Sequence, residues 1–156
     1  YEHVHDAEEA GPAQVGWVRG VYPVRSTAEA ALERGDLFVE EADGAVVGTG
    51  IFNRLQADVY AGAPWQYDAP DDQIMVLHTL AVDPQAGKRG LGRAFAAFYE
   101  QYAREHGCRY LRIDTNEKNE NARRLYAKLG YREAGIVPCV FNGIPGVNLV
   151  CLEKKL

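Results

Sequence analysis

A short run near the middle of the chain combines the residue types with which proteins bind phosphate groups. Val82-Asp83-Pro84 marks the end of a strand, and the loop Gly90-Leu91-Gly92 follows it. The basic neighbours of this loop are Lys88, Arg89 and Arg93. Glycine lets the backbone approach a ligand closely, and the free N–H groups of a helix start attract anions. The run therefore predicts a site for a cofactor that carries a pyrophosphate.

The spacing of the glycines is compatible with more than one motif. A Walker A loop is excluded, because Arg93-Ala94 follow Gly92 where that loop requires a lysine and a magnesium-binding hydroxyl. A dinucleotide-binding G-x-G stays an alternative: Phe95 replaces its third glycine, yet Asp114 is suitably spaced for a ribose contact. A plain glycine-rich turn with a solvated basic edge also fits the loop alone.

A second motif lies at residues 119–131. Asn119 stands at a predicted helix start, and Tyr126 follows about two turns later on nearly the same face. Together with the glycine loop and Leu80-Ala81-Val82-Asp83-Pro84, the pattern Asn119-x-x-Ala122-x-x-Leu125-Tyr126-x-Lys128-x-Gly130-Tyr131 resembles the Gcn5-related N-acetyltransferase (GNAT) superfamily. The resemblance covers residues 74–131 closely and the flanking strands more loosely.

The resemblance implies an α/β fold of the acyl-CoA N-acyltransferase type, with a mixed central sheet, splayed parallel strands and helices on both faces. Residues 1–156 are then a single domain. The family's first strand is not visible before Tyr1, which predicts that native N-terminal sequence is missing. The implied activity is direct transfer of the acetyl group of acetyl-CoA to a primary amine in a ternary complex, without a metal ion.

The resemblance also assigns cofactor contacts. Acetyl-CoA would lie between the strand ending at Val82 and the strand ending near Asp114. The backbone of Leu80, Ala81 and Val82 would pair with the pantetheine arm, and the N–H of Leu80 would donate to the thioester oxygen, where negative charge grows. The phosphates would rest on Lys88, Arg89, Gly90, Leu91, Gly92 and Arg93. Asn119, Ala122 and Tyr126 complete the implied contacts.

One position of the glycine loop departs from the family pattern. Gly87 stands where the family usually has Gln or Arg. Part of the pyrophosphate grip therefore shifts to Lys88 and Arg89.

Tyr126 is the candidate general acid that protonates the departing CoA thiolate. A phenol stays protonated at neutral pH and is only modestly less acidic than a thiol, so the proton transfer is reasonable. The alternative is that Tyr126 only packs its helix against the sheet.

His78 is the candidate general base. On a regular strand it shares a face with Val76 and Leu80, and an ordinary pKa of ~6.5 suits the task. Val76 stands where some family members carry a Glu base. A hydrogen-bonded core role for His78 stays open, as do Asp114 or a relayed water as the base.

Two further groups of reactive residues are weaker candidates. Cys139 is a weak candidate for carrying an acyl group, because a cysteine in an apolar context is usually a small hydrophobe. His3 and His5 have strand spacing, but without further ligands a metal site there is not expected.

Charge divides the chain. The 156 residues carry a net charge of −5, yet residues 1–87 hold 4 Arg, no Lys and 15 acidic residues, whereas residues 88–156 hold 13 basic and 7 acidic residues. The balance excludes a uniformly basic nucleic-acid binder. We expect the acidic half to face a cationic amine acceptor and the basic half to face the anionic cofactor.

Cysteine count and hydropathy bear on the compartment. The 3 cysteines form no C-x-x-C pair, which favours a reducing, cytoplasmic location, and no apolar run is long enough for a membrane span. A homodimer is compatible with the sequence.

The elements that position these residues follow from periodicity and turn signals. Ser26 and Glu29 form a capping box for a helix to Arg34, and Asp43-Gly44 predicts a hairpin turn. Expected helices are 1–10, 27–34, 94–106 and 120–129, and expected strands are 37–40, 45–52, 74–82, 110–114, 131–137 and 147–153. We expect the first helices, the loop 53–72 with Trp65 and Tyr67, and the turn 141–146 to shape the acceptor site.

Two rivals to the enzyme stay open at this point. A non-catalytic acyl-CoA-binding or regulatory module would keep both motifs for binding alone. A dinucleotide-dependent oxidoreductase is the other, and it would bind NADH in place of acetyl-CoA.

Overall fold

The computed structural model describes residues 1–12, 14–87 and 89–156, which form one six-stranded sheet in the order β1-β2-β3-β4-β6-β5. The strands are β1 (Leu37–Ala42), β2 (Ala45–Asn53), β3 (Ile74–Val82), β4 (Tyr110–Asn116), β5 (Arg132–Phe141) and β6 (Ile144–Lys155). Within the described sheet, β3 and β4 are parallel and every other pair is antiparallel. This mixed sheet confirms the predicted acyltransferase fold and excludes the mostly parallel sheet of a dinucleotide-binding enzyme.

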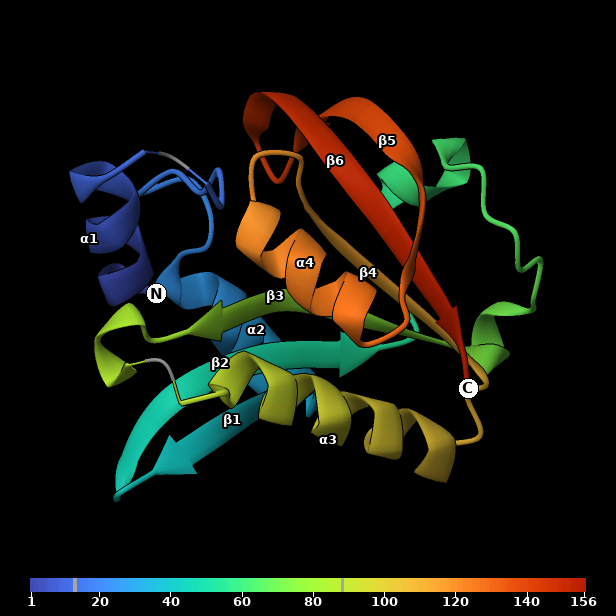
Figure 1. The fold of residues 1–156 in the computed structure, drawn as a ribbon, viewed down its shortest axis with the longest axis horizontal. Helices are drawn as coiled ribbons and strands as arrows, with labels where there is room; N and C mark the ends of the chain where they lie inside the picture. Colours follow the sequence, from blue (N-terminus) through green and yellow to red (C-terminus); the bar gives the residue numbers. More distant parts are fainter. Residues whose placement is uncertain (13, 88) are drawn as a thin grey trace.

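Helices lie on both faces of the sheet, as predicted. They are α1 (Glu2–Ala10), α2 (Arg25–Arg34), α3 (Leu91–Glu105) and α4 (Glu120–Lys128), with short 3₁₀ turns η1 (Asp58–Gly62), η2 (Asp71–Gln73) and η3 (Pro84–Ala86). Figure 1 shows α3 and α4 in front of the sheet and α2 behind it. Helix α3 packs on the sheet because Phe95, Tyr99 and Ala103 recur every fourth residue and are buried.

The start of α2 differs from the prediction. The backbone N–H of Val24 donates to Oγ1 of Thr27 at 3.1 Å, so Val24 is the N-cap residue and the helix begins at Arg25. The predicted cap at Ser26 is therefore wrong, because the hydroxyl of Thr27 takes over the local hydrogen bonding. The predicted stop at Gly35 is confirmed by its φ of 76°.

The alternating side chains of β3 separate two hydrophobic clusters. Met75 and Leu77 belong to the cluster under α3 and α4, together with the buried Phe52. Ile74 and Val76 belong to the cluster on the opposite face. Strand β3 is therefore buried on both faces, as its nearly continuous apolar run predicts.

The parallel strands β3 and β4 separate halfway along their length. Their pairing runs from Ile74↔Tyr110 to Leu77↔Ile113 and then stops. Beyond that point β3 continues to Val82 beside β2, and β4 continues to Asn116 beside β6. Figure 1 shows the two strand ends moving apart with α4 in front of them, which confirms the expected splay.

A bulge interrupts β3 in the splayed region. His78 pairs with Ile51 and Ala81 pairs with Thr49, so β3 holds one more residue than β2 over this interval. Thr79 has a φ of 49°, which is strained for a β-branched side chain. The extra residue turns Leu80 towards the cluster under α3 and α4. The expectation that Leu80 shares a face with His78 is therefore wrong.

Turn residues explain both hairpins. Asp43 and Gly44 have φ values of 53° and 77°, which confirms the predicted turn between β1 and β2. The second hairpin is tighter than the expected loop 141–146, because Asn142 and Gly143 also have positive φ values, of 50° and 82°, and close the turn between β5 and β6. Within the described ranges, no helix has the length and hydropathy needed to span a bilayer.

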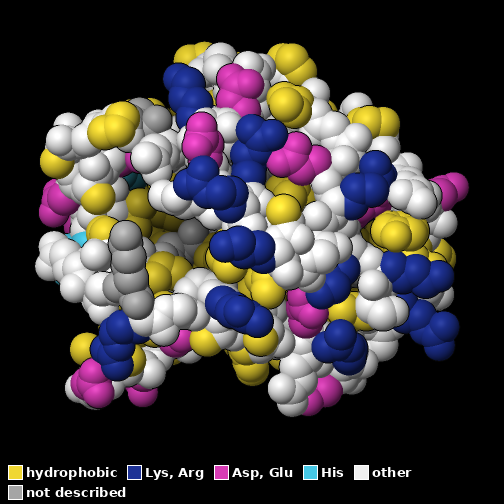
Figure 2. Space-filling model, in the orientation of Figure 1, with side chains coloured by type: hydrophobic (Ala, Val, Ile, Leu, Met, Phe, Trp, Pro, Cys, Tyr) yellow, Lys and Arg dark blue, Asp and Glu magenta, His cyan; other side chains and the backbone are white. Residues whose placement is uncertain are grey.

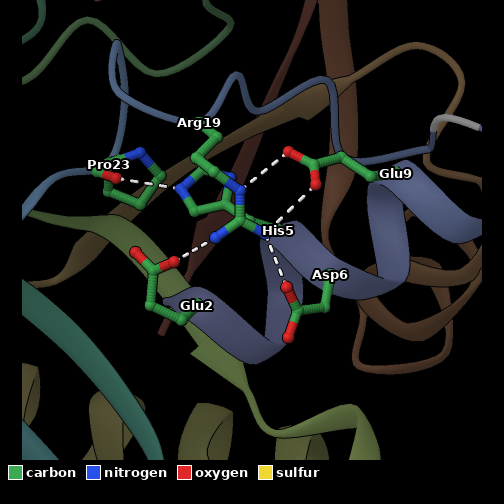
Figure 3. A network of polar contacts seen from close by, with 6 residues as sticks. All are labelled: Glu2, His5, Asp6, Glu9, Arg19 and Pro23. Carbon is green, nitrogen blue, oxygen red and sulfur yellow. Dashed lines mark hydrogen bonds and ion pairs between the residues drawn. The ribbon is translucent and has the colours of Figure 1, made fainter.

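Residues 14–23 are held against α1 by a polar network (Figure 3). Arg19 makes ion pairs with three carboxylates of α1: Glu2, Asp6 at 2.6 Å and Glu9 at 2.8 Å. One acidic helix face is thereby used to hold a single arginine.

Two further contacts hold the ends of this segment. The buried side chain of His5 places Nε2 3.0 Å from the carbonyl oxygen of Pro23. At the other end, the carboxylate of Glu8 accepts hydrogen bonds from the backbone N–H groups of Gln14, Val15 and Gly16, at 3.1, 3.1 and 2.6 Å. Residues 14–23 are thus held in a fixed position against α1.

Candidate active site

A cavity of about 630 Å³ opens where β3 and β4 diverge. Its walls come from residues 14–22, from residues 55–57 after β2, from the ends of β3 and β4, from α4 and from the turn after β5. Figure 2 shows this hollow beside α4 with hydrophobic side chains inside it. The same view shows Lys and Arg side chains gathered over α3 and α4.

The glycine loop leads into α3 without a capping side chain among the described residues. Gly90 is the N-cap residue, with a φ of 74°, and because glycine has no side chain it offers no cap to the first N–H groups of the helix. Such groups bind anions readily. Gly92 lines the cavity, and a Cβ atom there would lie 3.3 Å from the Leu125 side chain. The loop therefore fits a pyrophosphate at this end of the cavity.

The basic neighbours of the loop lie at the surface or outside the described residues. Lys88 belongs to the latter group. Arg89 is half-exposed and forms an ion pair of 2.9 Å with Asp43 in the β1–β2 turn. Arg93 is exposed on the first turn of α3.

The bulge leaves part of β3 without a strand partner in the described sheet. Leu80 and Val82 line the cavity, whereas Ala81 pairs with Thr49 and is buried. Thr79 and Leu80 have no register partner on β2 or on β4. This backbone is therefore free to pair with an extended ligand, which is the arrangement that a pantetheine arm requires.

The start of α4 also borders the cavity. The side chain of Asn119 caps the helix, because its Oδ1 accepts a hydrogen bond from the N–H of Ala122 at 3.2 Å. Both residues line the cavity. Asn119 therefore has a structural task beside any contact with a cofactor.

Tyr126 lies two turns further along α4. It is buried, belongs to the core cluster with Tyr131 and lines the cavity. Its hydroxyl makes no hydrogen bond to a described residue. Burial raises the pKa of Tyr126 well above its usual value, and the charge of Asp114 adds to this. The phenol is therefore protonated at neutral pH, and the raised pKa makes it a weaker acid than a free phenol.

Asp114 places a carboxylate in the cavity wall. The hydroxyl of Tyr60, on η1, donates a hydrogen bond of 2.6 Å to Oδ2 of Asp114. Among the described residues, Oδ1 has no hydrogen-bond partner. Burial raises the pKa of Asp114 to about 6, and the hydrogen bond from Tyr60 opposes this rise. A carboxyl group with this pKa can accept a proton near neutral pH.

His78 also lines the cavity, on the side away from α4. Its Nε2 lies 2.8 Å from Oδ1 of Asn53, so this nitrogen carries the proton. Burial lowers the pKa of His78 to about 4. The imidazole is therefore neutral and weakly basic, with one nitrogen already engaged.

Sequence reasoning missed two aromatic residues of the cavity wall. The hydroxyl of Tyr22 is hydrogen-bonded to Oγ1 of Thr79, at the bulge. Trp17 packs edge-on against Tyr22, with ring centroids 6.2 Å apart. Both come from the segment that Arg19 holds. The sequence signal that marks this segment is the hydrophobic run around Pro23.

The expected role of Trp65 and Tyr67 is wrong. Neither belongs to the described lining of the cavity. Trp65 donates to the carbonyl oxygen of Tyr60 at 2.8 Å and stacks on Arg112, whose guanidinium carbon lies 4.1 Å from the ring centroid. The loop therefore contributes residues 55–57 to the wall, whereas Trp65 supports the site through Tyr60.

The other reactive residues lie elsewhere. Cys139 packs against the cluster around Tyr60. His3 pairs with Asp83 at 3.1 Å, and His5 bonds to Pro23 as described above. In the described part of the chain, no group of three or more His, Cys, Asp or Glu side chains is placed to hold a metal ion.

Solved structures share this fold. A GNAT-family acetyltransferase from Streptococcus agalactiae superposes with a TM-score of 0.77 at 24% identity, covering 98% of this chain and 84% of that one. The Salmonella typhimurium protein yncA, solved with its cofactor acetyl-CoA, superposes with a TM-score of 0.69 at 17% identity, covering 99% of this chain and 86% of that one.

Sequence comparison gives the family. Mycothiol acetyltransferase from Cellulomonas flavigena is 26% identical over 62% of this chain and 26% of its own length. The chain spans 26–41% of the length of the curated relatives it matches. The model of the acetyltransferase (GNAT) family matches residues 5–131. The chain belongs to the acetyltransferase (GNAT) family.

Proposed function

We propose that this protein transfers the acetyl group of acetyl-CoA to the amine of a small acceptor, and that residues 1–156 act as a single catalytic domain. The observation that carries the proposal is the unpaired backbone of Thr79 and Leu80 beside a cavity that reaches both Tyr126 and Asp114. Structural neighbours solved with acetyl-CoA or CoA support the choice of cofactor.

Acetyl-CoA would supply an activated acetyl thioester to this cavity. The uncapped start of α3, residues 90–93, would hold its phosphates together with Lys88 and Arg89. Leu80, Ala81 and Val82 would pair with its extended arm. Asn119 and Ala122 would border it at the start of α4.

Leu80 has the stabilising role in the transfer. Its backbone N–H would donate to the thioester oxygen as negative charge develops during attack by the amine. A fixed donor of this kind contributes about 2.7–4 kcal/mol. The positive φ of Thr79 orients that donor, because it sets the direction of the following peptide.

Asp114 is the general base in this proposal. Its free Oδ1 would accept the proton that the acceptor ammonium must lose before the amine attacks. His78, the base that the sequence predicts, is the weaker base, because its pKa is about 4 and its Nε2 already bonds to Asn53.

Tyr126 is the general acid. Its phenol would give a proton to the sulfur of CoA as the thioester bond breaks. The resulting phenolate is reprotonated from solvent. Asp114 and Tyr126 thus handle two different protons, and once Asp114 is protonated by the acceptor its charge no longer opposes loss of the proton from Tyr126.

The acceptor is a cationic amine, a homodimer is the proposed assembly, and the cytoplasm is the proposed compartment. The carboxylate of Asp114 in the cavity supports the first point. The cysteines Cys108, Cys139 and Cys151 are all free, which suits a reducing compartment. Sedimentation equilibrium with and without acetyl-CoA tests the dimer.

A thiol-release assay tests the function. Purified protein is mixed with acetyl-CoA and a panel of primary amines, and free CoA is measured with the acetylated product. Steady release that depends on an amine is expected. Binding of acetyl-CoA without release would support the non-catalytic module instead. Calorimetric titration with acetyl-CoA and NADH is expected to show binding of acetyl-CoA alone.

A further inference from the structure

Most of the described cavity lining is apolar or neutral. Its aromatic residues include Trp17, Tyr22 and Phe141, and its neutral amides include Gln56 and Asn142. Among the described lining residues, Asp114 is the one acidic group and Lys and Arg are absent. His78 is neutral there, because burial lowers its pKa to about 4.

Two described arginines, one bonded to a wall residue and one between wall residues in the chain, are already engaged. Arg112 stacks on Trp65 and donates to Oε1 of Gln56 at 2.9 Å, behind the wall. Arg19 faces the carboxylates of α1. A ligand in the cavity therefore finds one fixed negative charge and no fixed positive charge among the described residues.

This charge pattern distinguishes between classes of amine. The ammonium group of an acceptor gains a partner in Oδ1 of Asp114. A carboxylate on the same carbon would lose its water, find no counter-ion and lie close to a like charge. A site that leaves a buried charge unpaired rejects that ligand strongly.

We propose that the acceptor is a primary amine whose amino-bearing carbon carries no carboxylate, with an aromatic or apolar body that packs against Trp17 and Phe141. The inference rests on the proposed acetyl transfer. It excludes free α-amino acids as good substrates. The neutral amides of Gln56 and Asn142 leave room for an uncharged polar group on the acceptor.

Three matched probes test the proposal: phenethylamine, phenylalanine and phenylalaninamide. With saturating acetyl-CoA, we expect kcat/KM for phenethylamine to exceed that for phenylalanine by about 100-fold or more. Phenylalaninamide, which has similar bulk but no carboxylate, is expected to stay within about tenfold of phenethylamine. Equal values for phenethylamine and phenylalanine would overturn the proposal. Equally poor values for phenylalanine and phenylalaninamide would also overturn it, because bulk and not charge would then decide.

Binding measurements make the test independent of turnover. Calorimetry on the CoA-bound protein is expected to detect phenethylamine and not phenylalanine. In Asp114→Asn, which keeps the shape of the side chain, the preference is expected to fall at least tenfold. An unchanged preference would show that the charge of Asp114 does not cause it. Preferential turnover of phenylalanine would leave acetyl transfer intact and sink this inference alone, whereas no turnover with any amine would remove both.

Discussion

The hydroxyl of Tyr60 and the carboxylate of Asp114 are 54 residues apart in the chain and 2.6 Å apart in the structure. The bond occupies Oδ2 and leaves Oδ1 to the cavity. Tyr60 is itself fully buried, and its carbonyl oxygen accepts a hydrogen bond from the indole of Trp65. A buried phenol thus fixes the orientation of Asp114 by holding one carboxylate oxygen while the other is left for chemistry, and burial raises the pKa of Asp114 to about 6 against the effect of this bond.

The pH profile of kcat/KM is expected to rise with a midpoint near pH 6. Asp114 must be ionised to accept a proton, and its pKa is about 6. Asp114→Asn should lose this limb and about 100-fold or more of kcat/KM. His78→Gln is the matched comparison. If the limb disappears in His78→Gln and persists in Asp114→Asn, His78 is the base.

Removing the phenol of Tyr60 should move this midpoint upward. The hydrogen bond from Tyr60 favours the ionised carboxylate, so Tyr60→Phe is expected to raise the pKa of Asp114 by roughly one pH unit. The measurement is the pH profile of kcat/KM. Tyr67→Phe, outside the cavity, should leave the profile unchanged. A midpoint that stays in place in Tyr60→Phe would contradict the positioning role.

The free energy of unfolding should fall over the pH range in which ionisation of Asp114 raises the activity. Its folded pKa lies above the ordinary value, so stability is full below about pH 4 and falls as pH rises through 6. Asp114→Asn removes this cost and should be about 1–3 kcal/mol more stable than the wild type at pH 8. Urea unfolding at pH 4 and pH 8 checks this. A destabilised variant at pH 8 would show that the ionised carboxylate is needed for folding.

Tyr126→Phe should lower kcat by ~10–1000-fold with little change in acetyl-CoA affinity, because it removes the proton donor and keeps the ring. Steady-state kinetics and a direct titration with acetyl-CoA measure the two effects. Tyr131→Phe is a suitable control, since its ring packs edge-on against Tyr126 in the same cluster. Unchanged turnover in Tyr126→Phe would reduce Tyr126 to a packing residue.

Arg19→Gln should weaken acceptor binding selectively. It leaves Glu2, Asp6 and Glu9 without their shared partner and loosens the wall that carries Trp17 and Tyr22. We expect a higher KM for the amine and an unchanged KM for acetyl-CoA. Arg25→Gln is the control, because the Arg25 guanidinium pairs with Glu29 at the surface. A similar rise in both constants would place the effect elsewhere.

Elements with strong local signals could be predicted from the sequence. The hairpin at Asp43-Gly44, the apolar strand from Ile74 and the helix starting at Asn119 each depend on neighbouring residues, and the structure has all three. The family resemblance implies the mixed sheet with splayed parallel strands. Local pattern alone does not say that β6 lies between β4 and β5.

Features that depend on distant residues could not be predicted. Glu153 accepts hydrogen bonds from the backbone of Gln66 and Tyr67, and this contact draws the aromatic loop away from the cavity. Arg123 pairs with Glu133 at 2.7 Å, so a basic residue of the second motif stabilises the fold. Local periodicity carries no information on such pairs.

The bulge at Thr79 makes the number of residues in β3 as important as their identity. Deleting one residue there would restore a regular ladder with β2, in which Leu80 falls opposite Gly50 while Ala81 and Val82 keep their partners. The strand would keep its hydrophobic composition and lose its unpaired backbone. Length changes in this interval should therefore be tolerated far less than substitutions.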